Sequence, residues 1–290
     1  MNDDPKDLRV LLAPNPSPLT GPGTNTFLLG RDRVAVIDPG PDLPGHRQAI
    51  LDAVAARGGQ ISHIFVTHAH LDHSGGAMAL ARATGAPLLA FGPAQAGRSP
   101  AMERLSGLGR LGGGEGLDAG FTPDVKLADG AQVDGGEWSL TAHHTPGHFG
   151  NHLCFQWGDS IFCGDLVLGW ATTLISPPDG DLADFMRSLA RLEQLAPARL
   201  LPAHGDPIST PTARIAELAA HRRARSAQII AALRDGPSDA ATLAARLYDV
   251  PAPLMPAAAR NVLAHLIVLA DLGAITPKGE IHADTNFAVL

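Results

Sequence analysis

The stretch FVTHAHLDHSGG, residues 65–76, carries three histidines and an aspartate within six positions: His68, His70, Asp72 and His73. Imidazole and carboxylate groups are ligands that suit zinc, with iron and manganese as competitors. Four such groups could build only an incomplete pair of metal sites. If this stretch binds metal, further ligands must therefore come from residues downstream.

Three downstream segments offer such ligands beside apolar strands. TPGHFGNH places His148 in a loop between two predicted strands, and IFCGD places Asp165 at the end of a strand. LPAHG places His204 just past the last strand of this region. A site built along one edge of a sheet would need ligands at such positions, so we expect all seven side chains to meet there.

The elements that must position these side chains are short strands and helices, which we predict from the apolar pattern. The predicted strands are RVLLAP, TNTFLLG, RVAVID, ISHIFVT, PLLAF, WSLTAHH, HLCFQW, SIFCGD and ARLLPAHG. Helices are predicted over residues 45–57, after the HAHLDH motif as far as Gly85, and over DLADFMRSLARLEQL with Asp181 as N-cap. Residues 92–122 are rich in glycine and predict a mobile loop beside the active face, with a disordered insertion as the alternative.

After about residue 210 the pattern changes to helices. Three are predicted, over TARIAELAAHRRARSAQIIAALRDG, over SDAATLAARLY with Ser238 as N-cap, and over PAAARNVLAHLIVLADLG. AITPKGEIHAD predicts a hairpin that turns at Lys278 and Gly279. Three helices followed by a hairpin outline a winged helix, so we predict one domain over residues 1–210 and a winged-helix-like domain over residues 211–290.

The motifs THAHLDH, TPGH, CGD and PAHG, in this order, resemble the metallo-β-lactamase-fold superfamily over about residues 10–210. The resemblance implies an α+β protein whose catalytic domain is a four-layered αβ/βα sandwich, with a metal cleft at one edge of two sheets. Carried over by position, the first-metal ligands are His68, His70 and His148, the second-metal ligands are Asp72, His73 and His204, and Asp165 bridges both. Seven matches in order argue against histidines that share no role.

The chemistry implied by this resemblance is hydrolysis. Two divalent cations that share a water bring its pKa near neutrality and so supply a nucleophile. Asp72 is the expected catalytic residue, which holds the water and then moves its proton. Zn²⁺ is the expected metal, with Mn²⁺ and Fe²⁺ left open because the same ligands accept them.

Three residues near the motifs are candidates to orient the ligands. Asp38, in VAVIDPG, resembles the family's aspartate near the metals, and a turn aspartate before Pro-Gly is the alternative. His144 and His152 flank the TPGH motif and could hold a ligand through a hydrogen bond. Local packing is the alternative for both histidines.

Two further residues are candidates to line a substrate pocket. Asn25, in GPGTNTFLLG, could face the pocket, although the start of a hairpin would explain the same pattern. Trp170 lies a few residues beyond Asp165 and could wall the cleft, with a buried core position as the alternative.

Details of the sequence separate branches of the superfamily. Antibiotic-cleaving members of the best-known type have a cysteine ligand where this chain has Asp165, and the basic glutathione-binding patch of glyoxalase II-type thioesterases has no clear equivalent. GTNTFLLG, GDLVLGW and the helical HRRARSAQII resemble the β-lactamase-like protein 2 group, which includes endoribonucleases that prefer single strands. HRRAR is the one basic cluster, and we interpret it as a solvated helix face.

The expected activity is therefore that of a dinuclear metal-dependent hydrolase, with single-stranded RNA as the substrate that this resemblance implies. A thioesterase or lactonase acting on a small molecule remains an alternative. Two others are a winged-helix nucleic-acid-binding regulator with a metal-sensing domain and a mononuclear iron persulfide dioxygenase. Partners are then RNA or a small molecule, and a homodimer would cover the apolar third helix of the C-terminal region.

Composition sets the outer bounds of these hypotheses. The 290 residues are 45% hydrophobic and 18% charged, with a formal net charge of -7. The overall charge therefore does not indicate binding to nucleic acid or to an anionic membrane. The N-terminus has no signal-peptide pattern and no apolar stretch reaches about 18 residues, so we expect a cytoplasmic protein with no membrane partner. Pairing outward from a turn at residues 158–159 places Cys154 opposite Cys163, which we expect to be reduced core cysteines, with a disulfide as the alternative.

Overall fold

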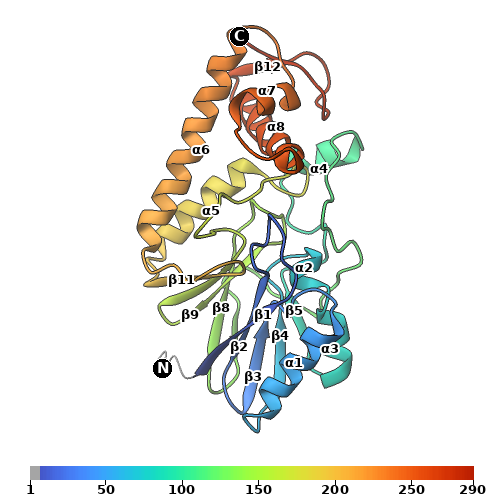
Figure 1. Ribbon diagram of the computed structural model, residues 1–290, viewed down its shortest axis with the longest axis vertical. Helices are drawn as coiled ribbons and strands as arrows, with labels where there is room; N and C mark the ends of the chain where they lie inside the picture. Colours follow the sequence, from blue (N-terminus) through green and yellow to red (C-terminus); the bar gives the residue numbers. More distant parts are fainter. Residues whose placement is uncertain (1–6) are drawn as a thin grey trace.

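The computed structural model describes residues 7–290, so the sequence-based expectations about residues 1–6 lie outside the described residues. Two β-sheets lie face to face, and helices cover their outer faces (Figure 1). This arrangement is the mixed α/β sandwich that the sequence predicts. The helices of the C-terminal region lie above one end of the sandwich in this view (Figure 1).

The first sheet has six strands in sequential order: β1 (Leu8–Ala13), β2 (Thr24–Leu29), β3 (Arg33–Ile37), β4 (Gln60–Phe65), β5 (Leu88–Ala90) and β6 (Val125–Lys126). Strands β3 to β6 are parallel, because α1 (Pro44–Ala55) and α3 (Ala77–Thr84) return the chain to the same edge. Ile64 packs with these helices, whereas its neighbour Phe65 packs between the two sheets. Burial on both faces explains the continuous apolar run in β4.

The second sheet has the order β11-β10-β9-β8-β7. Its strands are β7 (Gln132–Asp134), β8 (Ser139–His144), β9 (Leu153–Trp157), β10 (Ser160–Gly164) and β11 (Arg199–Pro202). Helix α5 (Leu182–Gln194) connects the parallel pair β10 and β11 and covers the outer face with Phe185 and Leu189. The predicted N-cap is confirmed, since the Asp181 side chain accepts hydrogen bonds from the backbone N–H groups of residues 183 and 184.

The ends of three strands bring the predicted ligands to one edge of the sandwich. Strands β4 and β10 end at Phe65 and Gly164, shortly before the HAHLDH motif and Asp165 respectively, and β11 ends at Pro202, shortly before His204. Gly164 has a φ of 48°, and a Cβ there would lie 2.6 Å from His152 Nε2. Only glycine therefore allows the chain to turn here and present Asp165 to the sheet edge.

The C-terminal region consists of α6 (Pro211–Leu233), α7 (Ala240–Leu247), a 3₁₀ turn (Ala252–Leu254), α8 (Met255–Asp271) and a sheet of β12 (Ile275–Pro277) and β13 (Phe287–Val289). The three helices lie where the sequence predicts them. The predicted N-cap of α7 is wrong, because the Asp239 side chain caps it and Ser238 bridges to Phe287 through its backbone. The predicted hairpin turn at Lys278 and Gly279 is also wrong, since β12 pairs with β13, and this pairing uses the fully buried Phe287.

The glycine-rich segment contains a helix that the sequence analysis missed, α4 (Pro100–Gly107). Ser99 caps it by accepting a hydrogen bond from the backbone N–H of Met102. The segment then returns to the sheet edge, where the backbone N–H of Leu71 donates to Gly116 O at 2.8 Å. The predicted place of this segment, beside the active face, therefore agrees with the structure.

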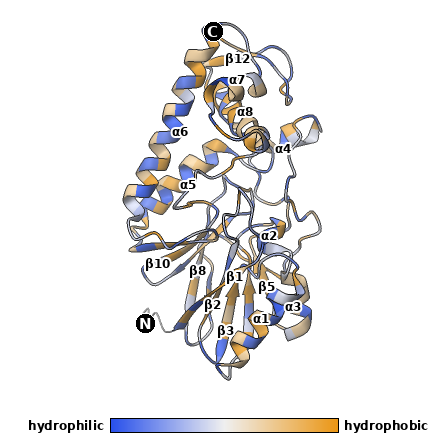
Figure 2. Ribbon diagram, in the orientation of Figure 1, coloured by the Kyte–Doolittle hydropathy of each residue, from blue (hydrophilic) through white to orange (hydrophobic). Residues whose placement is uncertain are grey.

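Apolar side chains pack between the two sheets, and α8 is among the most apolar elements (Figure 2). By length and composition alone, residues Ala252–Asp271 could cross a membrane, although half of that window is buried inside the protein. Helix α8 buries Leu263, Leu266 and Ile267 within the chain, and the expected homodimer stays a prediction. The two cysteines, Cys154 and Cys163, are buried and free, as the sequence analysis expects.

Candidate metal centre

The seven predicted ligands converge on one small space. In the first group, His70 Nδ1 lies 2.8 Å from His68 Nε2 and 3.1 Å from His148 Nε2. His68 and His70 come from the loop after β4, whereas His148 comes from the loop between β8 and β9. The three nitrogen atoms lie within 4.8 Å of one another, so they could hold one metal ion.

The second group lies next to the first. Asp72 Oδ2 lies 3.3 Å from His204 Nε2 and 3.5 Å from His73 Nε2. Asp165 sits between the groups: its Oδ2 lies 3.6 Å from His73 Nε2 and 3.7 Å from His148 Nε2. Its Oδ1 lies 3.4 Å from His204 Nε2. This position fits the bridging role that the sequence predicts for Asp165.

The hydrogen bonds of the histidines fit metal binding. His73 Nδ1 donates to Asp38 Oδ2 at 3.0 Å, His148 Nδ1 to Leu174 O at 2.7 Å, and His204 Nδ1 to Gly23 O at 3.0 Å. Each donation leaves the lone pair of Nε2 facing the cluster, which is how proteins orient metal-binding imidazoles. His73 Nε2 and Asp165 Oδ1 are buried without a hydrogen-bond partner, which a cation would relieve.

The buried carboxylates of the site are stabilised by neighbouring positive charge. Burial opposes ionisation of Asp165, yet His204 and His73 hold the pKa of that carboxyl well below its usual range. Despite burial, the charges of Asp72, Asp165 and Asp38 raise the pKa of His73 well above its usual value. The carboxylates therefore require neighbouring cations, and bound metals would replace the protons that otherwise supply them.

In the first group, burial outweighs the nearby carboxylate charges. It lowers the pKa of His68 well below its usual value and that of His70 to about 3, with His148 as a further cause for His70. Both imidazoles are consequently neutral at physiological pH. Neutral imidazole is the form that binds a metal.

Two of the three residues predicted to orient ligands make the expected contacts. Asp38 accepts hydrogen bonds from Thr67 N at 2.7 Å and Thr67 Oγ1 at 2.8 Å, besides that from His73. His152 Nε2 accepts from the backbone N–H of Asp165 at 3.3 Å. His144 instead donates to Gly150 O at 2.9 Å and stacks on the ring of Phe91, so local packing explains this residue.

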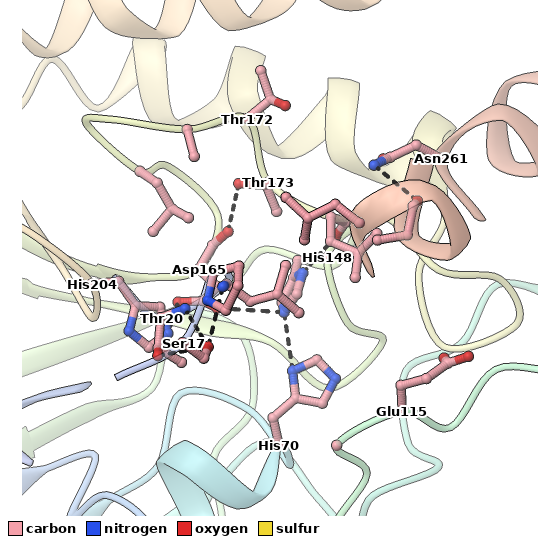
Figure 3. A pocket seen from close by; sticks show the side chains of 18 of the residues that line it. Ser17, Thr20, His70, Glu115, His148, Asp165, Thr172, Thr173, His204 and Asn261 are labelled. Carbon is pink, nitrogen blue, oxygen red and sulfur yellow. Dashed lines mark hydrogen bonds and ion pairs between the residues drawn. The ribbon is translucent and has the colours of Figure 1, made fainter. Parts of the chain in front are cut away.

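The metal-ligand cluster forms one end of a cavity of about 560 Å³. Figure 3 shows His70, His148, Asp165 and His204 along this cavity, with Asn261 of α8 on another side. The cavity is lined mainly by apolar side chains from both regions of the chain, including Leu19, Leu71, Leu168, Trp170, Tyr248, Val250, Leu254, Ala257 and Ala258. Within residues 7–290, no lysine or arginine is among the lining residues.

The two predicted pocket residues have different outcomes. Trp170 lines the cavity and is 49% exposed, so it is not a core tryptophan. Asn25 does not line the cavity, since its side chain donates to Pro202 O at 3.1 Å and Gly205 O at 2.8 Å. These two hydrogen bonds hold the loop that carries His204 against β2.

The sequence did not predict the cavity wall that α8 and the segment between α7 and α8 contribute. Tyr248, Leu254 and Asn261 belong to this wall. The apolar sequence of α8 predicts that the helix is buried, but it does not predict which part of the chain packs against it. No local pattern could therefore identify these residues as cavity lining. Glu115, the one lining carboxylate outside the ligand set in the described part of the chain, lies in the glycine-rich segment.

A cluster of histidines and carboxylates at the edge of an αβ/βα sandwich defines a class of metal-dependent hydrolases. The family model for the metallo-beta-lactamase superfamily matches residues 19–204. The chain belongs to this superfamily. The resemblance inferred from the four motifs is thus confirmed.

Relatives support this assignment over most of the chain. A protein named beta-lactamase-like protein 2 homolog from Drosophila melanogaster is 30% identical over 291 residues, which cover 96% of this chain and 92% of that protein. An atrochrysone carboxyl ACP thioesterase from Aspergillus chevalieri is 32% identical, covering 80% of this chain and 67% of that protein. A crystal structure of a metallo-beta-lactamase family protein from Thermus thermophilus matches 98% of this chain and 99% of its own, with 26% identity and a TM-score of 0.78.

Proposed function

We propose that this protein is a dinuclear zinc hydrolase that cleaves the thioester of an apolar acyl group. The observation that carries the proposal is the cavity: mainly apolar walls lead to the histidine and carboxylate cluster, and among residues 7–290 no lysine or arginine lines them. A cavity of this kind suits an uncharged acyl chain better than a polyanion. The thioesterase name of the Aspergillus chevalieri relative supports the same substrate class.

The reaction converts a thioester and water into a carboxylic acid and a thiol. When bound, two divalent cations would lower the pKa of a shared water so that a nucleophile exists near neutral pH. The Asp72 side chain is 26% exposed, whereas those of His73 and His204 are 0% and 1% exposed. Asp72 can therefore reach both the water and the substrate, accept the proton of the water and pass it to the leaving thiolate.

The cavity walls have the complementary task of binding the acyl group. Leu19, Leu71 and Trp170 are each about half exposed and lie at the cavity, where they can cover an apolar chain. Transfer of this chain out of water contributes about 25 cal/mol per Å² of buried apolar surface. Such binding holds the carbonyl carbon at the cluster without any charged contact.

Cleavage of single-stranded RNA is the second candidate, favoured by the kinship with beta-lactamase-like protein 2 homologs. In this candidate residues 211–290 act as a winged-helix-like domain beside a catalytic domain of residues 1–210. The contacts of α8 speak against such a role. Arg260 donates to Ser176 Oγ at 2.9 Å and Asn261 accepts from Ile175 N at 3.1 Å, so both face the protein instead of a nucleic acid.

The deciding experiment offers both substrates to the same zinc-loaded protein. Thioesters of N-acetylcysteamine with acyl chains of increasing length are followed by release of free thiol, and labelled single-stranded RNA is followed by electrophoresis. We expect thioester hydrolysis that rises with chain length and is abolished by chelation and by Asp165→Asn. Asp52→Asn, on the outer surface of α1, is the matched control with full activity expected.

Other outcomes would reject the proposal. RNA cleavage that chelation and Asp165→Asn abolish, with thioesters left intact, would establish the nuclease instead. Hydrolysis that is equal for all acyl lengths would remove the role assigned to the apolar walls.

A further inference from the structure

Two consecutive residues between β10 and α5, Thr173 and Leu174, contact two predicted metal ligands. Thr173 Oγ1 donates to the backbone oxygen of Asp165 at 2.8 Å, a contact visible in Figure 3. Leu174 O accepts the Nδ1 proton of His148 at 2.7 Å. We call residues 173–175 the ligand-support segment, because it hydrogen-bonds the backbone of Asp165 and the imidazole of His148.

The C-terminal helices hold this segment from its other side. Asn261 of α8 accepts a hydrogen bond from Ile175 N at 3.1 Å through its Oδ1. Arg222 of α6 donates to Thr173 O through Nη2 and to the same Asn261 Oδ1 through Nη1, the latter at 3.1 Å. Arg222 and Asn261, which are far from the ligand-support segment in the sequence, thus bind its two ends.

Arg222 is buried without an opposite charge among its hydrogen-bond partners. The residue is 2% exposed, and its guanidinium lies 5.2 Å from the centre of the Phe185 ring. Its hydrogen-bond acceptors, a backbone carbonyl and an amide oxygen, are both neutral. Burying a charge without an opposite charge is unfavourable, so a residue placed for packing alone would be apolar.

We propose that Arg222 and Asn261 are positioning residues of the metal centre, acting through the ligand-support segment on His148 and Asp165. Arg222 fixes the Thr173 end and Asn261 fixes the Ile175 end. The carbonyl of Leu174, midway between them, is thereby held in line with His148 Nδ1. The inference rests on the metal centre of the proposed function and not on the identity of its substrate.

The chemistry of the two side chains fits this task. A guanidinium presents several N–H donors in one rigid plane, so a single Arg222 can bind two acceptors at once. Burial lowers the pKa of Arg222 to about 10, which still leaves it charged at neutral pH. Loss of a group that orients a metal-binding histidine typically weakens metal affinity by about 10–100-fold.

The test measures metal binding directly, with Asn261→Leu and Arg222→Met as the disruptive variants. Leucine has nearly the size of asparagine but accepts no hydrogen bond, and methionine retains the stem of arginine without its donors. Asn261→Asp keeps the accepting oxygen and should behave like the natural protein. Arg225→Met is the matched control, because Arg225 lies on the same helix but binds Leu247 O and the ring of Tyr248.

Zinc affinity is measured by competition with a chromophoric chelator, cobalt-loaded protein gives the visible absorption spectrum, and circular dichroism of the metal-free proteins checks their fold. We expect Asn261→Leu and Arg222→Met to lower the affinity for one of two zinc ions by about 10–100-fold and to change the cobalt spectrum. Asn261→Asp and Arg225→Met should retain both metals.

The proposal fails if Asn261→Leu binds both zinc ions with unchanged affinity. It also fails if Arg225→Met weakens zinc binding equally, since a general loss of packing would then explain the effect. Should Arg222→Met not fold, the contrast between Asn261→Leu and Asn261→Asp still decides. Zinc affinity is independent of turnover, so absence of thioester hydrolysis would reject the proposed function and leave this result intact.

Discussion

At the scale of single residues, Asp38 shows how the metal centre depends on contacts around its ligands. Its φ of 50° lies in the left-handed region, which residues other than glycine seldom adopt. Its carboxylate accepts hydrogen bonds from Thr67 N, Thr67 Oγ1 and His73 Nδ1. The strained conformation therefore persists because three contacts at the cluster require it.

Asp38→Asn should weaken metal binding without unfolding the protein. Asparagine tolerates the left-handed conformation, so the substitution removes the charge and one accepting oxygen while the backbone stays as it is. We expect the affinity for the metal held by His73 to fall by about 10–100-fold, measured by metal content after dialysis against a chelator. Asp42→Asn, an exposed aspartate paired with Arg47, is the control, and equal losses in both variants would contradict the assignment.

Trp170→Ala should raise KM for an apolar thioester while kcat stays nearly constant. Trp170 lines the cavity near Gly21 and Gly205 and is not one of the predicted metal ligands, so its loss removes binding surface and leaves the ligand set unchanged. Loss of its apolar surface predicts a rise in KM of about ten-fold, which corresponds to about 1.4 kcal/mol. Leu272→Ala removes an exposed apolar side chain outside the cavity lining and should leave KM unchanged. A fall in kcat with constant KM would place Trp170 in the chemistry instead.

At the scale of elements, the local sequence patterns predicted the ligand positions, whereas they did not predict contacts between segments that are far apart in the sequence. The ligand positions could be predicted because each motif joins a residue type to a strand end within a few residues. Arg222 lies 49 positions from Thr173 in the sequence, and the HRRAR pattern resembles a solvated face. That interpretation holds for exposed Arg223 and is wrong for Arg222, because only the packing of α6 on α5 decides which arginine is buried.

The glycine-rich segment offers a test of how tightly it packs against α8. Gly113 has a φ of 97°, and a Cβ there would lie 2.9 Å from Pro177 O and from Arg260 Nη2. Gly114 has a φ of 82° and open space around a Cβ, so it is the matched control. We expect Gly114→Ala to lower the free energy of unfolding by about 1–2 kcal/mol and Gly113→Ala by about 1–3 kcal/mol more. Chemical denaturation measures the difference, and equal effects would show that the segment moves away freely.

His265 of α8 predicts a loss of stability in acid. Burial lowers its pKa to about 3, with nearby Arg222 and Arg225 as further causes. Between about pH 3 and pH 6.5, the unfolded state therefore binds a proton at this histidine that the folded state does not bind. Its contribution to stability is full above pH 6.5 and is lost as the pH falls toward 3, with a slope of up to about 1.4 kcal/mol per pH unit.

Replacement of this histidine should make the acid loss shallower. His265→Met removes the titrating group from a site that is 0% exposed, whereas His282→Asn alters a partly exposed residue and serves as control. Urea unfolding of the metal-free proteins at several pH values gives the slopes. Parallel slopes for the natural protein and His265→Met would contradict the buried neutral state.

At the scale of the whole molecule, the C-terminal helices and the sandwich act as one structure. Ile215, Leu218 and Ala264 share an apolar cluster with residues of β10 and α5. Tyr248 and Ala258 complete the cavity whose other end is the metal-ligand cluster. The cavity therefore exists only while both regions are packed together, and no motif in either region alone could predict it.

Charge at this scale leads to a prediction about salt. The chain carries a formal net charge of -7, and in the described part of the chain no lysine or arginine lines the cavity. A neutral thioester gains nothing from long-range attraction, so kcat/KM should change by less than about two-fold between about 50 and 200 mM salt. Binding through about 6–10 phosphate contacts would weaken by about 10³–10⁵ over the same range. Steady-state kinetics at constant pH with added potassium chloride measures this, and a steep fall would mean that a cationic surface outside the cavity guides an anionic substrate.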